Sequence, residues 1–374
     1  MRPLHALPQS FYEEIAYAKA ILAPFTKRAY LVGGSVRDLL LNKPLHDMDI
    51  EVYDMTPEAF DALMQHVGAV GVGKSFFVYK LGNIDFSLPR KEHKNGIGHS
   101  AFDVQICHDE KEASFRRDFS MNAMMINIFT EAFLDFWGGA RSIANKQIAL
   151  IDEERFKEDS LRVLRAVQFS ARFGFKIEPK TLEVMRAISL KDLSHSRILW
   201  EFEKLFCGSF LHYGLFYMYK LDLFEKCLFS AVPKCFLSIA RELIRTSCNF
   251  QKTLQAYYFF YIVANRLGHH PLAWFKRLEA PNHYLNACKH QPFFKGKIDD
   301  KMLYETSLDI PLCSWLGNYR EGVEKRAKEL GIWAKAFDGG IGVQEVIKDG
   351  FKDKAIGIEL KKRRIEKMNQ LCKA

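Results

Sequence analysis

The segment from Asp47 to Tyr53 alternates between acidic and apolar residues, and it constrains this chain more than any other feature of the sequence. A period of two is typical of a β-strand, so the segment predicts a strand with Asp47, Asp49 and Glu51 on one face. Like charges this close repel one another, most strongly where water is scarce. A divalent cation would relieve the repulsion, and Mg²⁺ prefers carboxylate and phosphate oxygens. A solvated edge strand is the alternative interpretation.

A glycine turn precedes this acidic strand. The apolar run 29–32 stops at Gly33 and Gly34, which favours a strand that ends in a turn. Ser35 then leads into a short predicted helix, and we expect it near the N-cap. Free backbone N–H groups and the helix dipole at such a turn form a phosphate cradle, to which Arg37 could add a fixed positive charge.

A third carboxylate, Asp85, lies in the run 84–88, where apolar residues alternate with Asp85 and Ser87. A phosphate cradle beside two or three strand carboxylates matches the needs of two-metal nucleotidyl transfer. In that chemistry one metal activates an attacking hydroxyl. The other metal holds the triphosphate and neutralises the leaving pyrophosphate.

The secondary-structure signals change along the chain. Up to about residue 140 they are mixed, with an amphipathic helix over 1–26, a helix that opens at Thr56 and Pro57, and strands at 76–81 and 83–88. After residue 150 the strand signals fade and helical periods dominate. We therefore expect an α+β fold, in which a small mixed α/β domain is followed by helical domains.

Composition sets outer limits on the class of protein. The chain has 374 residues, of which 48% are hydrophobic and 26% charged, so it is neither a disordered nor a collagen-like chain. The length predicts two or three domains. Lys and Arg number 54 against 45 Asp and Glu, and the resulting net charge of +9 permits a polyanionic partner without requiring one.

No apolar run approaches the roughly 18–20 residues of a membrane-spanning helix, so we expect no membrane insertion. The strongest candidate, 256–264, is closely flanked by Lys252 and Arg266 and predicts a buried helix. The N-terminal segment lacks a secretory apolar region. The eight cysteines contain no CxxC pair, so we expect no zinc site, and unpaired thiols suit a cytoplasmic location.

Four sequence blocks, taken in order, resemble the class II tRNA nucleotidyltransferases and bacterial poly(A) polymerases, members of the polymerase-β-like nucleotidyltransferase superfamily. The first block is GGSVRD at 33–38 followed by DMD at 47–49, and the second is RRDFSMNA at 116–123. The third is EDSLRVLRAVQF at 158–169, and a degraded fourth block covers 193–205. A single block of this kind is weak, whereas four in the family's order predict membership.

The resemblance implies a role for each matching residue. Asp47 and Asp49 would bind two Mg²⁺ ions, with Asp85 or Glu51 as a third catalytic carboxylate. The triphosphate would meet the glycine turn, the sugar would meet the second block, and the base would be read by Watson–Crick-like hydrogen bonds from the third. The nucleotide-binding residues predicted in this way are Gly33, Gly34, Ser35, Arg37, Arg117, Asp118, Asn122, Asp159, Arg162 and Arg165.

Helical periodicity agrees with the role of the third block. At 100° per residue, Asp159, Arg162 and Arg165 share one broad face, and Leu164 and Val167 fall on the opposite face. The polar face could then point at a cleft while the apolar face anchors the helix. Without the resemblance, an i,i+3 salt bridge between Asp159 and Arg162 would be the preferred interpretation.

Some positions depart from the family's pattern. Gln168 stands where the family usually has a further Arg, and Ser196 stands where the fourth block usually has Glu. The segment 88–99 resembles the basic, glycine-containing loop of other full CCA-adding members; its basic side chains could contact phosphates, or the loop could be mobile and solvated. The basic run 361–364 similarly predicts either a solvated helix face or a phosphate-contacting patch.

Taken together, the sequence predicts a template-independent tRNA nucleotidyltransferase that adds 3′-terminal CCA from CTP and ATP. The expected parts are an N-terminal helix (1–26), a catalytic head (27–140), a base-reading helical neck (141–210) and a helical body and tail (211–374) that bind the tRNA acceptor arm. A partial CC-adding or A-adding enzyme and a poly(A) polymerase share these motifs. A catalytically inactive RNA-binding protein is the alternative of a different class.

Overall fold

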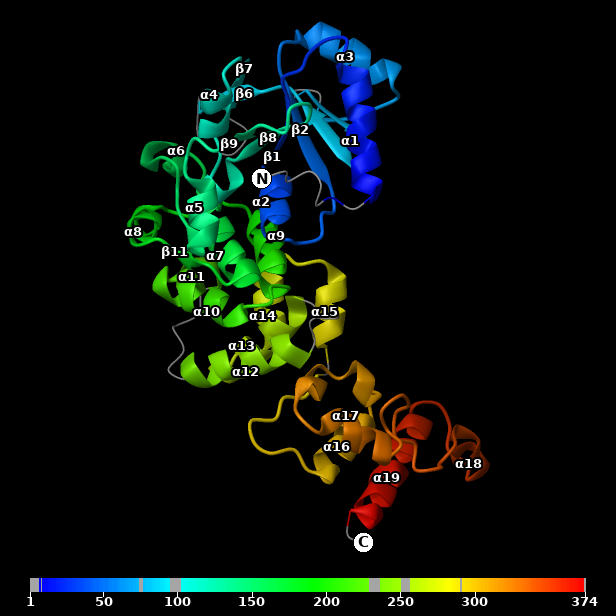
Figure 1. Ribbon diagram of the computed structural model, residues 1–374. Helices are drawn as coiled ribbons and strands as arrows, with labels where there is room; N and C mark the ends of the chain where they lie inside the picture. Colours follow the sequence, from blue (N-terminus) through cyan, green and yellow to red (C-terminus); the bar gives the residue numbers. More distant parts are fainter. Residues whose placement is uncertain are drawn as a thin grey trace. The chain divides into compact units, whose positions relative to one another are not determined.

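The structure of the protein is a computed structural model. It describes residues 7, 9–73, 77–94, 102–228, 236–249, 256–289 and 291–372. The chain divides into two compact units, Met1–Ser194 and His195–Ala374, and each is described by itself. Figure 1 shows their elements in chain order. No helix in the described ranges is long and apolar enough to cross a lipid bilayer.

Within the described residues of the first unit, a seven-stranded sheet has the order β3-β4-β5-β2-β1-β8-β9 (Figure 1). Its strands are β1 (Ala29–Val32), β2 (Met48–Val52), β3 (Val70–Gly73), β4 (Val78–Leu81), β5 (Ile84–Ser87), β8 (Met125–Asn127) and β9 (Phe133–Leu134). Strand β2 is central, antiparallel to β1 and parallel to β5. The acidic segment therefore lies in the middle of the sheet and not at an edge.

Alternation of side chains divides this sheet into two faces. The apolar residues of β2 belong to the main core, where they meet α1 (Gln9–Leu22) and α3 (Pro57–His66). Asp49 and Glu51 project from the opposite face. That second face carries a smaller apolar cluster that includes Tyr30, Val32 and Met125. The alternation of β2 thus places Asp49 and Glu51 on the face of the sheet that carries the smaller apolar cluster.

Short elements complete the first unit. A separate hairpin is formed by β6 (Arg90–Lys94) and β7 (Phe102–Ile106), and a two-residue parallel pair by β10 (Gln147–Ile148) and β11 (Lys176–Ile177). The remaining helices are α2 (Gly34–Leu40), α4 (Glu110–Phe115), η3 (Ser120–Asn122), α5 (Gly139–Ala144), α6 (Glu153–Lys157), α7 (Leu161–Phe173) and α8 (Pro179–Ala187). Helix α7 ends at Gly174, whose φ of 68° suits a residue without Cβ.

The second unit contains helices and no strand in the residues described. These helices are α9 (His195–Phe206), α10 (Leu211–Lys220), α11 (Leu223–Leu228), α12 (Phe236–Asn249), α13 (Ala256–Leu267), α14 (Pro271–Arg277), α15 (Asn282–Cys288), α16 (Asp300–Ser307), η4 (Leu312–Ser314), η5 (Leu316–Tyr319), α17 (Val323–Glu329), α18 (Val343–Lys348) and α19 (Lys354–Leu371). Aromatic residues of α9 and α13 stack closely, with the rings of Phe206 and Phe259 3.8 Å apart. A further core contains Trp315 and Met368.

The structure confirms the predicted α+β class and most of the predicted elements. Strand 29–32, the acidic strand, the helix after Thr56 and the helix around 256–264 are all present. His270 caps α14, and its side chain accepts a hydrogen bond from the Leu272 N–H. Strands β3 and β6–β11 were not predicted. Most of them are short, whereas β7, with the sequence FDVQI, alternates between apolar and polar residues and carried a signal that was overlooked.

Ser35 lies near the N-cap of α2, as expected: Gly33 occupies the cap with a φ of 69°, and Ser35 is the second residue of the helix. One expectation needs correction. The residues predicted to read the base do not share one helix, because α7 begins at Leu161 and Asp159 precedes it. The expected N-terminal helix spans only 9–22 of the described residues, and the loop portion 95–99 lies outside them.

Candidate active site

Two carboxylates meet across the central pair of parallel strands. Asp49 on β2 lies directly opposite Asp85 on β5 in the strand register. One oxygen of Asp85, Oδ1, is buried and has no hydrogen-bond donor among the described residues. It forms an ion pair with the Nζ of Lys80, 3.6 Å away. An oxygen that already faces a cation and accepts no hydrogen bond from the residues described makes this strand pair suited to a metal ion.

The electrostatics of Asp49 point the same way. Solvent still reaches its side chain, yet surrounding protein atoms strip part of its hydration and raise the pKa of the carboxyl to about 6. Arg117 opposes this shift, whereas the charges of Asp47, Asp85 and Glu51 add to it. Burial and the three neighbouring carboxylates therefore disfavour the ionised form of Asp49, an effect that a bound metal ion would offset.

Ser35 ties the glycine turn to the acidic strand. Its hydroxyl accepts a hydrogen bond from the Asp49 N–H at 3.2 Å and donates weakly to the Asp47 carbonyl at 3.4 Å. Asp47 itself is exposed just before β2. A Cβ built on Gly33 would come within 2.8 Å of the Arg117 guanidinium, so this position requires glycine. The turn, both strand acids and Arg117 thus converge.

Glu51 takes a different role from its neighbours on the same face. Its side chain is 1% exposed, and its Oε1 lies 2.7 Å from Arg116 and 3.1 Å from Arg117. Burial would raise the pKa of Glu51, but the two guanidiniums outweigh it and the pKa is lowered. The carboxylate neutralises two partly buried arginines, and Asp85 is left as the better candidate for a third catalytic carboxylate.

Residues of three sequence blocks form one buried hydrogen-bond network. Arg37 donates to Asn122 at 2.7 Å, and Asn122 donates to Asp118 at 2.8 Å. Arg165 of α7 donates to the other oxygen of Asp118 at 2.7 Å. Burial would raise the pKa of Asp118, but Arg165 and these hydrogen bonds lower it. The second and third blocks, far apart in sequence, are therefore physically joined.

Arg37 is buried within this network. Its guanidinium forms a double hydrogen bond with Asp38, at 2.8 and 2.9 Å, in addition to the bond to Asn122. The side chain is only 6% exposed. Arg37 was expected to contact a triphosphate. Each of the three nitrogens of its guanidinium already donates a hydrogen bond within the protein.

The residues predicted to read the base, Asp159 and Arg162, lie around the start of α7. Asp159 accepts a hydrogen bond from the Leu161 N–H at 3.1 Å. Arg162 donates to the carbonyl of Arg155 at 2.6 Å and to that of Arg116 at 2.8 Å. Arg162 thereby fixes α7 to the second block through main-chain contacts. These two carbonyl contacts go beyond the i,i+3 salt bridge with Asp159 that the alternative interpretation predicts.

Several residues of the site received no role from sequence reasoning. Arg116, Asp38 and Phe169 all lie inside the quoted blocks, yet only their contacts reveal what they hold in place. Gln168 is fully buried, and its amide nitrogen has no hydrogen-bond partner among the described residues. The adjacent pair Arg116 and Arg117 was the one signal in the sequence for these contacts, since arginines that become buried need acidic partners.

A metal ion at this site would need ligands beyond the protein. Within the described ranges, no three His, Cys, Asp or Glu side chains are gathered closely enough to hold a metal alone. Mg²⁺ is often bound by one or two carboxylates together with substrate phosphates and water. The pair Asp49 and Asp85 fits that kind of shared coordination, since Oδ1 of Asp85 is buried and accepts no hydrogen bond from the described residues.

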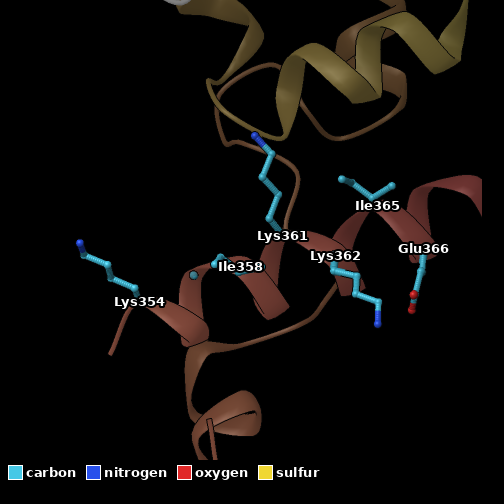
Figure 2. A pocket seen from close by; sticks show the side chains of 7 residues that line it. Lys354, Ile358, Lys361, Lys362, Ile365 and Glu366 are labelled. Atoms are coloured by element: carbon cyan, nitrogen blue, oxygen red, sulfur yellow. The ribbon is translucent and has the colours of Figure 1, made fainter. Parts of the chain in front are cut away.

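Away from this site, an open cavity of about 700 Å³ follows α19, where the basic run 361–364 lies (Figure 2). Lys361 pairs with Asp309 at 2.7 Å, and Arg363 pairs with Asp349 at 2.6 Å. Figure 2 shows Lys354 and Lys362 extending away from the helix. The basic run is thus partly engaged within the fold.

Comparison with family models places two matches on the chain. The model described as the poly A polymerase head domain matches residues 29–149. The model described as a probable RNA and SrmB-binding site of polymerase A matches residues 174–231. The first match contains the acidic strands, the glycine turn and the Asp118–Asn122 network.

Relatives and solved structures agree with these matches. The chain is 37% identical over 186 residues to the multifunctional CCA protein of Actinobacillus pleuropneumoniae, with 47% of this chain and 44% of that protein covered. It is 32% identical over 241 residues to the CCA-adding enzyme of Bacillus cereus, with 62% and 59% covered. The chain thus spans about half the length of the curated relatives it matches.

The fold resembles that of the Bacillus stearothermophilus CCA-adding enzyme solved in complex with CTP. The TM-score is 0.69 at 22% sequence identity, with 97% of this chain and 94% of that chain covered. At this identity the likeness concerns the fold alone. It extends over both units of the chain, including the helical part that the family models leave unmatched.

Proposed function

This chain belongs to the family of class II tRNA nucleotidyltransferases and bacterial poly(A) polymerases, and from that premise we propose that it adds 3′-terminal CCA to tRNA. The reaction would use CTP and ATP and release pyrophosphate. The observation that carries the proposal is the Asp49–Asp85 pair beside the glycine turn at Gly33, since nucleotidyl transfer needs strand carboxylates next to a triphosphate site.

Nucleotidyltransferases of this family use a divalent metal ion. We assign the ion as Mg²⁺ and its protein ligands as Asp47 and Asp49, with Asp85 as the third carboxylate. When bound, it would supply charge neutralisation at the triphosphate and lower the pKa of the attacking 3′-hydroxyl. Ser35 supports these ligands by holding the backbone of Asp47 and Asp49.

Other residues of the first unit would bind the nucleotide. Gly33, Gly34 and Ser35 would offer backbone N–H groups to the triphosphate, and Arg117, beside Gly33, would add positive charge. Arg37 is assigned to the same end of the nucleotide as a buried support, because its donors hold Asn122 and Asp38.

The sugar and the base would meet the network around α7. Asp118 and Asn122 would face the sugar, and Arg165 would keep Asp118 in place. Asp159 and Arg162 would read the base, because an Asp presents acceptors and an Arg presents donors in a fixed geometry. Arg162 would have to share its donors between the base and the two carbonyls that it contacts now.

The second unit would bind tRNA. A cavity of about 910 Å³ there lies among α12, α13, η5 and the start of α17, and five cationic side chains line it against three acidic ones. Glu242 is already engaged by Arg266 at 2.6 Å and by the hydroxyl of Tyr319, and Asp300 pairs with Arg326 at 2.6 Å.

The cations that remain are suited to phosphate groups. Arg241 and Lys297 are exposed, and neither forms an ion pair with another residue in the described ranges. Phosphate contacts dominate the affinity of proteins for nucleic acids, and unpaired cations around a hollow can follow a backbone without reading its sequence. We therefore assign this cavity to the RNA backbone, and the protein to the cytoplasm, where its six described free thiols would persist.

Substrate tests separate this function from its rivals. The protein is incubated with tRNAs that end before CCA, after C and after CC, with each nucleoside triphosphate alone. A full CCA-adding enzyme extends the first two with CTP and the third with ATP. A partial enzyme extends only some of them, and a poly(A) polymerase extends an oligo(A) primer instead. Binding of tRNA without incorporation of any nucleotide would indicate an inactive RNA-binding protein.

A further inference from the structure

Five side chains of the first unit form a closed ring of contacts. Three hydrogen bonds of 2.7 to 2.8 Å link Arg37, Asn122, Asp118 and Arg165 in that order. Phe169 closes the ring, because the centre of its aromatic ring lies 5.1 Å from the Cζ of Arg37 and 5.3 Å from the Cζ of Arg165. One aromatic side chain thus touches both cationic ends of the polar chain.

The ring of contacts allows only one orientation of the Asn122 amide. Its Oδ1 accepts from a guanidinium, which has no acceptor, and its Nδ2 donates to a carboxylate, which has no proton to give. Arg37, Asp118 and Asn122 are each less than 9% exposed, so water offers little competition for these bonds. After them, the amide keeps one N–H free to donate to a ligand.

A second aromatic residue strengthens the arrangement on the Arg37 side. The ring of Phe173 lies 4.8 Å from the Cζ of Arg37 and stacks on Phe169, with centroids 5.9 Å apart and planes at 17°. Aromatic faces attract guanidinium groups most strongly where water is excluded. Phe169 is 4% exposed and the Arg37 side chain 6%, so their contact is of this kind, whereas the Arg165 side chain remains 35% exposed.

We propose that Phe169 is a positioning residue that sets the preference for ribonucleotides over deoxyribonucleotides. The proposal rests on the proposed function, in which Asp118 and Asn122 face the sugar of the nucleotide. Phe169 holds the two arginines that fix these side chains, and so fixes the hydrogen-bonding groups offered to a 2′-hydroxyl. A site built to bond a hydroxyl discriminates strongly against a ligand that lacks it only while its groups stay in place.

The test compares CTP with dCTP on a tRNA that lacks CCA. For Phe169→Leu we expect the ratio of kcat/KM for CTP to that for dCTP to fall about tenfold, because the loosened site loses its bonds to the 2′-hydroxyl. The fall should come from CTP, whereas dCTP, which makes no such bond, should be used nearly as before. A Phe169→Tyr variant keeps the aromatic face and should retain most of the selectivity.

The matched control is Phe175→Leu. Phe175 is 3% exposed and its ring contacts Phe173 at 5.8 Å, but no cation of the described residues lies over it. Its replacement should cost comparable stability and leave the CTP/dCTP ratio unchanged. Thermal unfolding of each variant shows how much stability is lost, and Phe169→Met replaces the leucine variant should the latter fail to fold.

The outcomes separate the two proposals. A wild-type protein that incorporates no nucleotide contradicts the proposed function itself. An active, ribose-selective wild type combined with a folded Phe169→Leu variant of unchanged ratio overturns only the role of Phe169. Equal losses of CTP and dCTP incorporation, or an equal change of the ratio in Phe175→Leu, would likewise reduce Phe169 to a packing residue and overturn the inference.

Discussion

Asp49 and Asp85 lie opposite each other in the register of the parallel strands β2 and β5. Adjacent strands are about 4.8 Å apart, and partners in register project from the same face of the sheet. The pair therefore brings two carboxylates together beside Gly33 and Arg117. Glu51, the next acid along this face of β2, lies instead between two guanidiniums. Acids of one strand face thus serve different purposes.

Replacement of Asp85 by Asn should abolish most nucleotide addition without unfolding the protein. Asparagine keeps the shape of the side chain but removes the charge that faces Asp49, so incorporation should fall by at least about 100-fold. Incorporation of CMP into a tRNA that lacks CCA measures the effect. Ser87→Ala, which alters the next residue on the same face of β5, is the matched control and should keep full activity.

Glu51→Gln should chiefly reduce stability. Glu51 is buried between Arg116 and Arg117, and its replacement removes the carboxylate that both guanidiniums contact. Breaking a buried ion pair costs about 3–5 kcal/mol of unfolding free energy, which urea denaturation can measure. A Glu51→Gln variant with unchanged stability but no activity would contradict this assignment and make Glu51 a catalytic carboxylate.

Binding of metal by the free protein should depend on pH through Asp49. The pKa of its carboxyl is about 6, so at lower pH the group is protonated and cannot ligate a cation. Mn²⁺ affinity should therefore fall between about pH 7.5 and about pH 5, by up to tenfold per unit on the acidic side. Titrations with Mn²⁺ at several pH values measure this, and an Asp49→Asn variant should bind weakly with no such dependence.

The raised pKa of Asp49 also predicts how the stability of the folded protein changes with pH. Because the folded pKa lies above the ordinary value of 3.8, ionised Asp49 is disfavoured in the folded, metal-free protein. Its contribution to stability is present below the unfolded pKa and is lost as the pH rises through about 6. Asp49→Asn should therefore raise the Tm of metal-free protein at neutral pH and not at acidic pH. A Tm gain of equal size at both pH values would contradict the shift.

Sequence reasoning located the acidic strand and the glycine turn because both depend on local patterns. The alternation around Asp49 predicts its strand and its face, and the glycine turn at Gly33 follows from a break in an apolar run. The pairing of Asp49 with Asp85 is a property of strand order. The crossing from β2 to β5 passes over α3, β3 and β4, and no local pattern fixes that register.

What sequence reasoning missed depends on contacts between distant segments. Arg37 looked like a free cation at a turn, but burial against Phe169, Phe173 and Asn122 cannot be read from its neighbours. Residue preference placed Ser35 near the cap of α2 but did not identify the cap itself, which is Gly33. The positive φ of Gly33 allows an earlier helix start, which frees the serine hydroxyl to bond the acidic strand.

Asp159→Ala and Arg162→Ala should blur the choice of nucleotide. If these side chains read the base, both variants should incorporate UTP and GTP relative to CTP and ATP at least about tenfold more often than the wild type. Arg162 also holds the carbonyls of Arg155 and Arg116, so its variant should lose stability as well. Arg155→Ala is a suitable control for the local structure, and selectivity that survives both changes would place base reading elsewhere.

Arg241 and Lys297 should contribute to tRNA binding through phosphate contacts. Both line the cavity of the second unit without an ion-pair partner in the part of the chain described. Each phosphate contact that is removed lowers the slope of log affinity against log salt concentration by about 1. The double variant Arg241→Ala/Lys297→Ala should therefore bind tRNA more weakly at low salt, with a slope smaller by about 2, whatever the tRNA sequence.

The matched control replaces two exposed lysines of the same unit that lie outside this cavity, Lys325 and Lys348. Both double variants lose the same charge, so any effect of net charge alone is equal between them. A site at the cavity requires the salt slope to change only for Arg241 and Lys297, because counterions are released only where a phosphate is neutralised. Equal slopes in the two variants would mean that the RNA backbone follows another surface.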